Sequence, residues 1–163
     1  MKKLLVLPLA LLVTGTLTLS ACSKKKAPEE NTLPNAALAD ENLSGDSDNG
    51  KAMGLQTIHF PLDSFTFDSE AKGILKSNAQ ILKDKPTVKI QIEGHCDNRG
   101  GIQYNVALGE KRANAAKKFI ADNGINGDRI TVISFGKEKP IATGDDEASY
   151  AKNRRDNFVV TAH

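Results

Sequence analysis

The stretch EGHCDNRGG, residues 93–101, places a histidine, a cysteine and an aspartate side by side. His95, Cys96 and Asp97 are the residue types of a nucleophile with its base and orienting acid, or of part of a metal site. Catalytic Cys-His pairs are normally assembled from distant parts of a chain. If an extended strand continued through this stretch, His95 and Asp97 would lie on one face and Cys96 on the other. The spacing therefore does not favour catalysis.

The remaining histidines give no metal-binding pattern. His59 and His163 stand alone, and neither belongs to a spacing typical of zinc sites, such as HExxH or CxxC. We therefore predict a protein without a metal, a cofactor or enzymatic activity, with a cysteine-dependent enzyme as an alternative. Cys96 is expected to be a small packed side chain and His95 a half-buried one. Asp97, where a strand meets a glycine-rich loop, is therefore the candidate functional residue of this stretch.

The elements that must position Asp97 follow from hydrophobic periodicity. Residues 55–60, LQTIHF, predict a short strand. Asp68 or Ser69 is a suitable N-cap for a helix whose apolar residues recur with helical spacing until Pro86 ends it. The stretch TVKIQIEG, residues 87–94, alternates between apolar and polar residues and predicts a half-buried strand.

The second half of the chain continues this alternation of helices and strands. A helix is predicted over about residues 104–123, with Gly124 in the position favoured for a left-handed cap. Strands are predicted at residues 129–135 and 157–162, with a short helix at 145–153 between them. Strands separated by helices on one sheet predict a two-layer α/β sandwich.

The first residues have the form of a secretory signal peptide. Two lysines after Met1 precede an uncharged run from residue 4 to residue 19. This run is too short to be a convincing span, since a spanning helix needs roughly 20 apolar residues. It ends in LSAC, residues 19–22, which resembles the lipobox of bacterial lipoproteins. That resemblance implies removal of residues 1–21 and a lipid on Cys22 that anchors the chain to a membrane. An ordinary secreted protein is the alternative.

Residues 23–54 are rich in Ser, Asn, Asp, Gly and Pro and have no sustained apolar period. We therefore predict that residues 22–54 are a lipidated cysteine with a flexible tether, and that residues 55–163 are one folded domain. The precursor has 22 basic and 20 acidic residues, and loss of Lys2 and Lys3 with the signal peptide balances them. Aromatic residues are few and no basic run interleaves with them, so nucleic acid is not expected as a partner.

Four stretches in order resemble the OmpA-like peptidoglycan-binding family, and within it the peptidoglycan-associated lipoproteins of Gram-negative bacteria. They are EGHCDNRG, YNVALGEKRANA, SFGKEKP and DEASYAKNRR, and the similarity covers almost all of residues 57–160. The resemblance implies a βαβαββ fold, in which a mixed four-stranded sheet carries its helices on one face. It also implies a wall-binding protein without catalytic activity.

The resemblance implies a ligand as well, the stem peptide of peptidoglycan, held at its meso-diaminopimelate residue. The free end of that side chain carries a carboxylate and an ammonium group, so a site for it needs one cation and one anion. Asp97 and Arg112 match the family's two principal ligand residues. The guanidinium suits the carboxylate through two parallel N–H donors, and Asp97 can accept the ammonium group. Asp63, in FPLDSF, matches a further acidic residue of the family.

Neighbouring residues complete the site that the resemblance implies. Leu108 precedes Arg112 by one helical turn and can brace it against the core. Backbone N–H groups near Asn105, close to the predicted helix start, can bind a second oxygen of the ligand. Possible supporting residues are Tyr104, Arg154 and Arg155, and either of the two arginines could be the one near the site.

Two points stay open in the sequence. Asp97 and Arg112 could pair with each other and merely join a loop to a helix, an arrangement that contributes about 0 to 1 kcal/mol when exposed. Asp156 and Asn157 stand where the family commonly has apolar residues, so the limit of the last strand is also open.

With a lipid on Cys22, the resemblance implies a tether between the outer membrane and the cell wall, with the domain facing the periplasm. Ser23 favours the outer membrane, because an aspartate in its place is associated with retention in the inner membrane. The family also implies a Tol-system partner, TolB, and a role in envelope integrity and cell division. The alternatives are a wall-binding accessory or stator-type protein of another envelope machine, and a cysteine-dependent cell-wall enzyme.

Overall fold

The structure, a computed structural model, describes residues 45–163. The predicted signal peptide, the lipidated Cys22 and the tether up to residue 44 lie outside the described residues. Between residues 45 and 163, no helix combines the length and the apolar character that crossing a membrane requires.

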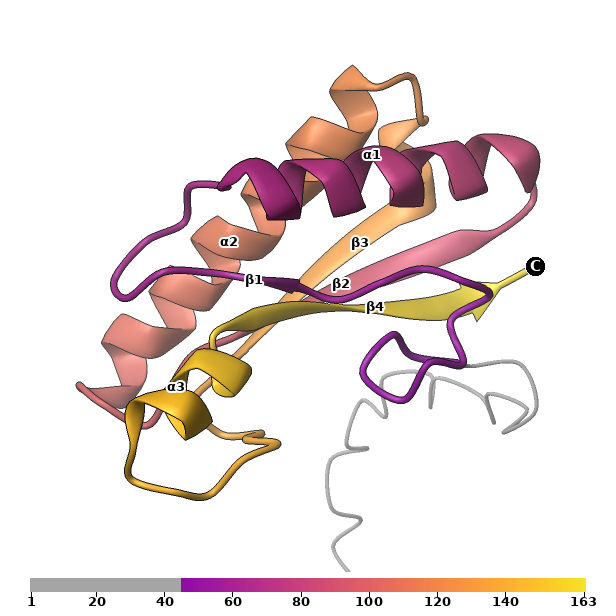
Figure 1. Ribbon diagram of the computed structural model, residues 1–163. Coiled ribbons are helices and arrows are strands. Elements are labelled where there is room, and N and C mark those ends of the chain that lie inside the picture. The colour runs from indigo at the N-terminus through magenta and orange to yellow at the C-terminus, as the bar shows by residue number, and fades with distance from the viewer. Residues whose placement is uncertain (1–44) are drawn as a thin grey trace, which may run out of the picture. The chain divides into compact units, whose positions relative to one another are not determined.

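Within the described residues, four strands form one mixed sheet (Figure 1). In chain order they are β1 (Ile58–His59), β2 (Lys89–His95), β3 (Ile130–Gly136) and β4 (Arg155–Ala162). Their order across the sheet is β1-β4-β2-β3. β2 runs parallel to β3 and antiparallel to β4, and β4 runs antiparallel to β1. The last strand of the chain therefore lies directly beside the strand that leads into the glycine-rich loop.

Two long helices, α1 (Ser69–Asp84) and α2 (Ile102–Asp122), pack on one face of this sheet (Figure 1). A 3-10 turn, η1 (Gly127–Arg129), precedes β3, and a short helix, α3 (Glu147–Asn153), precedes β4. The predicted α/β class, with a mixed four-stranded sheet and helices on one face, is confirmed.

Local sequence signals set the helix ends. The side chain of Asp68 accepts a hydrogen bond from the backbone N–H of Ala71 at 2.8 Å, as an N-cap does. α1 ends just before Pro86, which cannot continue a helix. After α2, Gly124 adopts a positive φ of 95°, a conformation that costs glycine little. α2 begins at Ile102, slightly before the start that the sequence predicts.

The alternating apolar residues around β2 form the centre of the core. Val88, Ile90 and Ile92 are 3%, 1% and 0% exposed. They belong to one buried cluster with side chains from both long helices and from β4, among them Leu75, Leu82, Ala116, Ile120 and Phe158. Full burial of a large aliphatic side chain contributes about 1.5 to 3 kcal/mol. This layer therefore holds β2 in place, and with it the loop that carries Asp97.

α2 approaches β2 closely where two glycines meet. A Cβ atom added to Gly94 would collide with the backbone of Gly109, and one added to Gly109 would collide with the side chain of Ser134. The two backbones can come together because neither glycine has a side chain. This contact holds the part of α2 that carries Arg112 against the end of β2.

Residues 45–54, predicted as part of the tether, instead pack on the domain. Asp46, which precedes β1 in the chain, forms a bridge with Val159 of β4. The backbone N–H of the next residue, Ser47, donates to Phe158 O at 3.0 Å. Asp48 pairs with Arg155 at 2.8 Å, and Ala52 is fully buried. The prediction failed here because the polar side chains that suggest a solvated coil make specific bonds to the strand.

β4 also begins earlier than predicted, at Arg155 rather than at residue 157. Asp156 and Asn157 pair with Gly94 and Glu93 of β2. Pairing with neighbouring strands sets this boundary, because the local polarity of Asp156 and Asn157 is unfavourable for a central strand.

The glycine contact can be tested by substitution. Gly94→Ala should lower the free energy of unfolding by about 1 to 3 kcal/mol or more, because the added methyl group forces α2 away from β2. Gly73→Ala is the matched control, since no atom lies within 4 Å of the added Cβ. It should be neutral or stabilise by up to about 1 kcal/mol, because alanine favours a helix more than glycine does. Urea denaturation followed by circular dichroism measures both, and equal effects would contradict the close approach.

Candidate functional site

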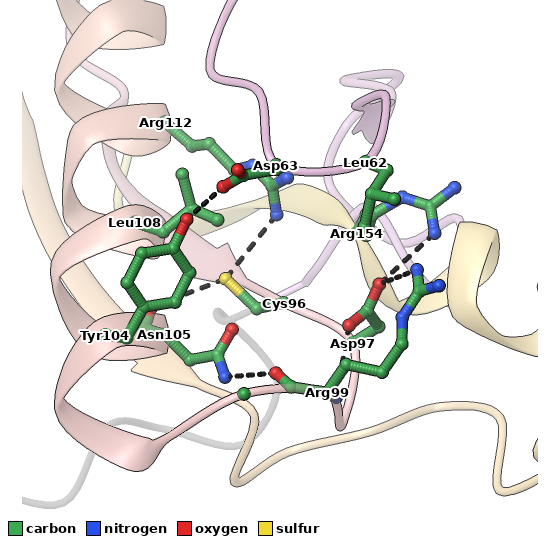
Figure 2. A pocket seen from close by; sticks show the side chains of 11 residues that line it. Leu62, Asp63, Cys96, Asp97, Arg99, Tyr104, Asn105, Leu108, Arg112 and Arg154 are labelled. Carbon is green, nitrogen blue, oxygen red and sulfur yellow. Dashed lines mark hydrogen bonds and ion pairs between the residues drawn. The ribbon is translucent and has the colours of Figure 1, made fainter.

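A pocket of about 360 Å³ opens at the end of β2, between the loops that follow β1 and β2 and the N-terminal half of α2 (Figure 2). Its lining residues are Leu62, Asp63, Cys96, Asp97, Arg99, Gly100, Tyr104, Asn105, Leu108, Arg112 and Arg154. The fold therefore brings together most of the residues that the sequence predicts for one site. Arg155 does not belong to the lining.

Arg112 forms one wall of the pocket and is 0% exposed. Its Nε donates to Ser64 O at 2.8 Å, its Nη1 to His95 O at 2.9 Å and its Nη2 to Pro61 O at 3.2 Å. The guanidinium also lies 4.8 Å from the ring centroid of Phe60. These partners are all uncharged, so among the described residues Arg112 has no ion pair.

The hydrogen bonds of Arg112 limit what it can offer a ligand. Nη1 also contacts Cys96 Sγ at 3.5 Å, which occupies its second N–H. An N–H of Nη2 is left without an acceptor among the described residues. Two parallel hydrogen bonds from Arg112 to a ligand carboxylate would thus require one of the present bonds to a backbone carbonyl to break. Burial lowers the pKa of Arg112 from its ordinary value, although an arginine keeps its charge in proteins.

Asp97 lies across the pocket from Arg112 and is bound by two other arginines (Figure 2). Its Oδ2 accepts from Arg99 Nη2 at 2.6 Å and from Arg154 Nη1 at 3.2 Å, and its Oδ1 accepts the backbone N–H of Arg99 at 3.2 Å. Burial alone would raise the pKa of Asp97, but these hydrogen bonds outweigh it and hold the pKa below its ordinary value. Asp97 is therefore ionised, and it does not form the alternative pair with Arg112.

The two adjacent arginines before β4 have different roles. Arg154 lines the pocket, where it binds Asp97, donates from Nε to Phe60 O at 3.0 Å and reaches Glu147 of α3 at 2.7 Å. Arg155 lies away from the pocket and pairs with Asp48. The question left open by the sequence is thus answered in favour of Arg154.

Arg99 is a pocket residue that the sequence analysis missed. Its guanidinium binds Asp97 and stacks 4.3 Å from the ring centroid of Tyr150 in α3. It also reaches Glu147 at 3.5 Å. Its position two residues after Asp97 is the only local signal, because Tyr150 and Glu147 approach it through the tertiary fold. Leu62, which lines the outer rim and is 57% exposed, was likewise missed.

Asp63 and Tyr104 close one side of the pocket (Figure 2). The Tyr104 hydroxyl donates to the carboxylate of Asp63, which raises the pKa of Tyr104. Asp63 has a positive φ of 53°, an uncommon conformation for a residue other than glycine. This turn conformation lies in the loop after β1, and the Asp63 carboxylate belongs to the pocket lining.

Asn105 and Leu108 line the pocket from α2. The side chain of Asn105 donates to Arg99 O at 2.7 Å and to Gly101 O at 3.1 Å, which holds the glycine-rich loop against the helix start. We expected backbone N–H groups near Asn105 to bind the ligand. The N–H of Asn105 itself donates to Gly101 O and is therefore not available. The free N–H groups of the helix belong to residues before Asn105. Leu108 is buried beside Arg112, where it was predicted.

Cys96 and His95 differ from their predicted placement. Cys96 is buried as expected, but its Sγ donates to Asn105 O and the residue lines the same pocket as Asp97. The alternation argument failed because β2 ends at His95. Burial raises the pKa of the Cys96 thiol and disfavours the thiolate. His95 is fully rather than half buried, stacks on Phe135 with ring centroids 5.6 Å apart and lies 3.6 Å from Glu93.

Between residues 45 and 163, no group of three or more His, Cys, Asp or Glu side chains is placed to hold a metal ion. The pocket itself offers three features to a ligand: the Asp97 carboxylate held by two arginines, the Arg112 guanidinium without a counter-ion among the described residues, and apolar contact from Leu108.

Known proteins share both this sequence and this fold. Residues 59–154 match the OmpA family. The chain is 35% identical to the peptidoglycan-associated lipoprotein of Pasteurella multocida over 146 residues, which cover 89% of this chain and 92% of that protein. The crystal structure of the peptidoglycan-associated lipoprotein from Burkholderia pseudomallei superposes with a TM-score of 0.62 at 35% identity, covering 71% of this chain and 97% of that one.

A more distant likeness concerns the fold alone. The C-terminal domain of Helicobacter pylori MotB superposes with a TM-score of 0.59 at 23% identity, covering 64% of this chain and 83% of that one.

The family model and the lipoprotein relatives confirm the resemblance that the four sequence stretches indicated. The protein belongs to the OmpA family.

Proposed function

We propose that this protein is an outer-membrane lipoprotein that binds peptidoglycan non-covalently, through the diaminopimelate residue of the stem peptide. The observation that carries the proposal is the pairing, in one pocket, of the ionised Asp97 with an Arg112 that has no counter-ion. The names of the relatives, which are peptidoglycan-associated lipoproteins, support peptidoglycan as the binding partner.

The ligand's two charges suit the two ends of the pocket. Its carboxylate accepts the remaining N–H of Arg112, which supplies the positive charge. Its ammonium group donates to Asp97 Oδ1, which carries only the backbone N–H of Arg99 and keeps capacity for another donor. Asp63 lies on the same pocket wall as Tyr104 and offers a second acceptor.

The same arrangement distinguishes diaminopimelate from lysine. A lysine side chain carries the ammonium group but lacks the carboxylate, so Arg112 would stay buried without a charged partner. A site built around a buried polar group rejects ligands that leave that group unpaired. The proposed site therefore selects for walls whose stem peptides contain diaminopimelate.

The affinity of the domain for a single stem peptide need not be high. A charge-assisted hydrogen bond contributes roughly 1.5 to 3 kcal/mol. A lipid on Cys22 would confine the domain beside a polymer of repeated stems, which raises the effective concentration of ligand. Weak and reversible binding is then sufficient to join a membrane to the wall.

The chemistry of the pocket supports binding rather than catalysis. The Cys96 thiol is buried, is hydrogen-bonded to a backbone carbonyl and has a raised pKa. His95, the nearest histidine in the sequence, stacks on Phe135, and the ring does not line the pocket. A cysteine nucleophile needs a base within hydrogen-bond reach. This arrangement does not favour the alternative of a cysteine-dependent cell-wall enzyme.

Localisation and partners complete the proposal. A lipid on Cys22 would anchor the chain to a membrane, and Ser23 favours the outer membrane, with the domain in the periplasm. A Tol-system partner, TolB, and a role in envelope integrity and cell division follow from the family resemblance. The alternative of a stator-type protein is supported only by a shared fold with MotB, whereas the similarity to lipoproteins extends over 89% of the chain.

The carboxylate of Asp97 tests the proposed ligand site. Asp97→Asn should weaken binding of a diaminopimelate-containing muropeptide roughly 10- to 100-fold, because it removes the anion that accepts the ammonium group. Calorimetric titration of the full chain in detergent measures this loss. Undiminished affinity would refute the role of Asp97.

Two controls sharpen this experiment. Asp48→Asn removes a carboxylate that also binds an arginine, Arg155, but lies outside the pocket. It should leave the affinity unchanged even if it destabilises the fold. The muropeptide with lysine in place of diaminopimelate should bind the wild type at least about tenfold more weakly, since it leaves Arg112 unpaired. Equal affinity for both muropeptides would contradict the assignment of the ligand.

The lipid anchor is tested separately. Cys22→Ser should release the protein from the membrane fraction, because the substituted residue cannot carry the thioether-linked lipid. Cys96→Ser is the matched control and should stay attached. Fractionation of cells followed by immunoblotting distinguishes them, and a Cys22→Ser protein that remains with the membrane would show that the lipobox interpretation is wrong.

A further inference from the structure

Asp156 is a buried acid that the proposed mechanism does not use. It lies in β4, is 0% exposed, and neither of its carboxyl oxygens has a hydrogen-bond partner among the described residues. It also departs from the apolar residues that the family resemblance leads one to expect at this place. A fully buried carboxyl group without a donor is costly, so its retention calls for a physical explanation.

The register of the sheet places Asp156 on the helix-covered face. It pairs with Gly94 of β2 on one side and with Ile58 of β1 on the other, and paired residues point to the same face. Ile58 belongs to the core, and Gly94 contacts Gly109 of α2. Arg112 follows Gly109 by about one turn of α2, on the side of the helix that faces the sheet. Asp156, beside Gly94 in the sheet, therefore lies between β4 and α2, beneath Arg112.

The surroundings of Asp156 contain few ionisable groups. Arg112 is the one ionisable side chain among the buried residues of α2, and α1 buries none. Cys96, after β2, is another titratable group near Asp156, while Arg154, two residues before Asp156, pairs with Asp97 and Glu147 instead. Glu93, His95 and Arg155 belong to the alternate positions of β2 and β4, on the opposite face. Asp156 thus faces one cation and one thiol across an apolar layer.

The absence of donors decides the charge of this group. Burial raises the pKa of Asp156 well above its ordinary value, and attraction to Arg112 offsets only part of that effect. The Asp156 carboxyl is therefore neutral under conditions in which Asp97, held by two arginines, is ionised. Arg112 is left with neutral acceptors on every side.

We propose that Asp156 is a positioning residue of the ligand site: a protonated carboxyl group beneath Arg112 that leaves the guanidinium charge free for the ligand's carboxylate. This inference rests on the proposed function. If Asp156 ionised, it would become a buried counter-ion of Arg112 and compete with the ligand. Affinity should then fall as the pH rises through the folded-state pKa of Asp156.

The test compares the wild type with Asp156→Asn, an amide of the same shape that cannot ionise. Meso-diaminopimelic acid is titrated into the full chain in detergent between about pH 5 and about pH 9. At the acid end the two proteins should bind within about twofold of each other. Over the pH range in which Asp156 ionises, the wild type should lose at least about threefold in affinity relative to the variant. The ratio cancels titration of the ligand's own ammonium groups.

A matched control and a readout without ligand complete the test. Asp122→Asn changes an exposed acid at the end of α2 and should follow the wild-type profile. The infrared band of a protonated carboxyl group at neutral pH should be lost in Asp156→Asn. Because a neutral buried acid stabilises the fold below the unfolded-state pKa and loses that contribution as the pH rises, the melting temperature of the wild type should fall relative to the variant with increasing pH.

The outcomes separate the two proposals. A carboxyl band that is absent or unaffected by Asp156→Asn, or an affinity ratio that stays constant while that band is lost with rising pH, would overturn the role of Asp156. A band that persists over the whole range, together with a constant ratio, agrees with a carboxyl group that stays protonated beneath Arg112. Failure of both proteins to bind at any pH, with the band and the stability difference present, would contradict the proposed function instead and remove the ligand role of Asp156 with it.

Discussion

The buried guanidinium of Arg112 ties three parts of the domain together. Its N–H groups reach Pro61 and Ser64 in the loop after β1 and His95 at the end of β2, while its own backbone belongs to α2. A charged group without solvent is tolerated when most of its donors are satisfied, so both loops must present their carbonyls to it. The same hydrogen bonds that make Arg112 tolerable inside the fold also set the walls of the pocket.

Charge is divided unequally between the two ends of this pocket. Asp97 is held by Arg99 and Arg154 and is already aligned, whereas Arg112 has only neutral partners. A ligand with a carboxylate therefore finds an unmatched cation, and one with an ammonium group finds a preorganised anion. Neither end requires a large rearrangement of side chains, which limits the entropy cost of binding. The Gly94–Gly109 contact supports this geometry by holding α2 against β2.

Local signals were sufficient to predict most of the helices and strands. The Asp68 cap, the alternation around Ile90 and Gly124 act over a few residues, so they survive in the sequence as short patterns. Asp97 and Arg112 were predicted as site residues from the motifs that carry the family resemblance, and the structure brings both to one pocket. The errors concern contacts between distant segments: residues 45–54 resemble a coil until they bond to β4, and β4 extends through polar Asp156 because its neighbours pair with it.

The sequence by itself determined the class of the fold, the order of its elements and most of the charged residues that line the pocket. Only the tertiary structure decided how those charges are matched: that Arg154 rather than Arg155 binds Asp97, that Arg99 joins it, that Arg112 is surrounded by carbonyls, and that Asp156 lies beneath it. The reason is physical. The charge state and partners of a group depend on burial and on atoms far away in the chain, and neither is encoded in the spacing of nearby residues.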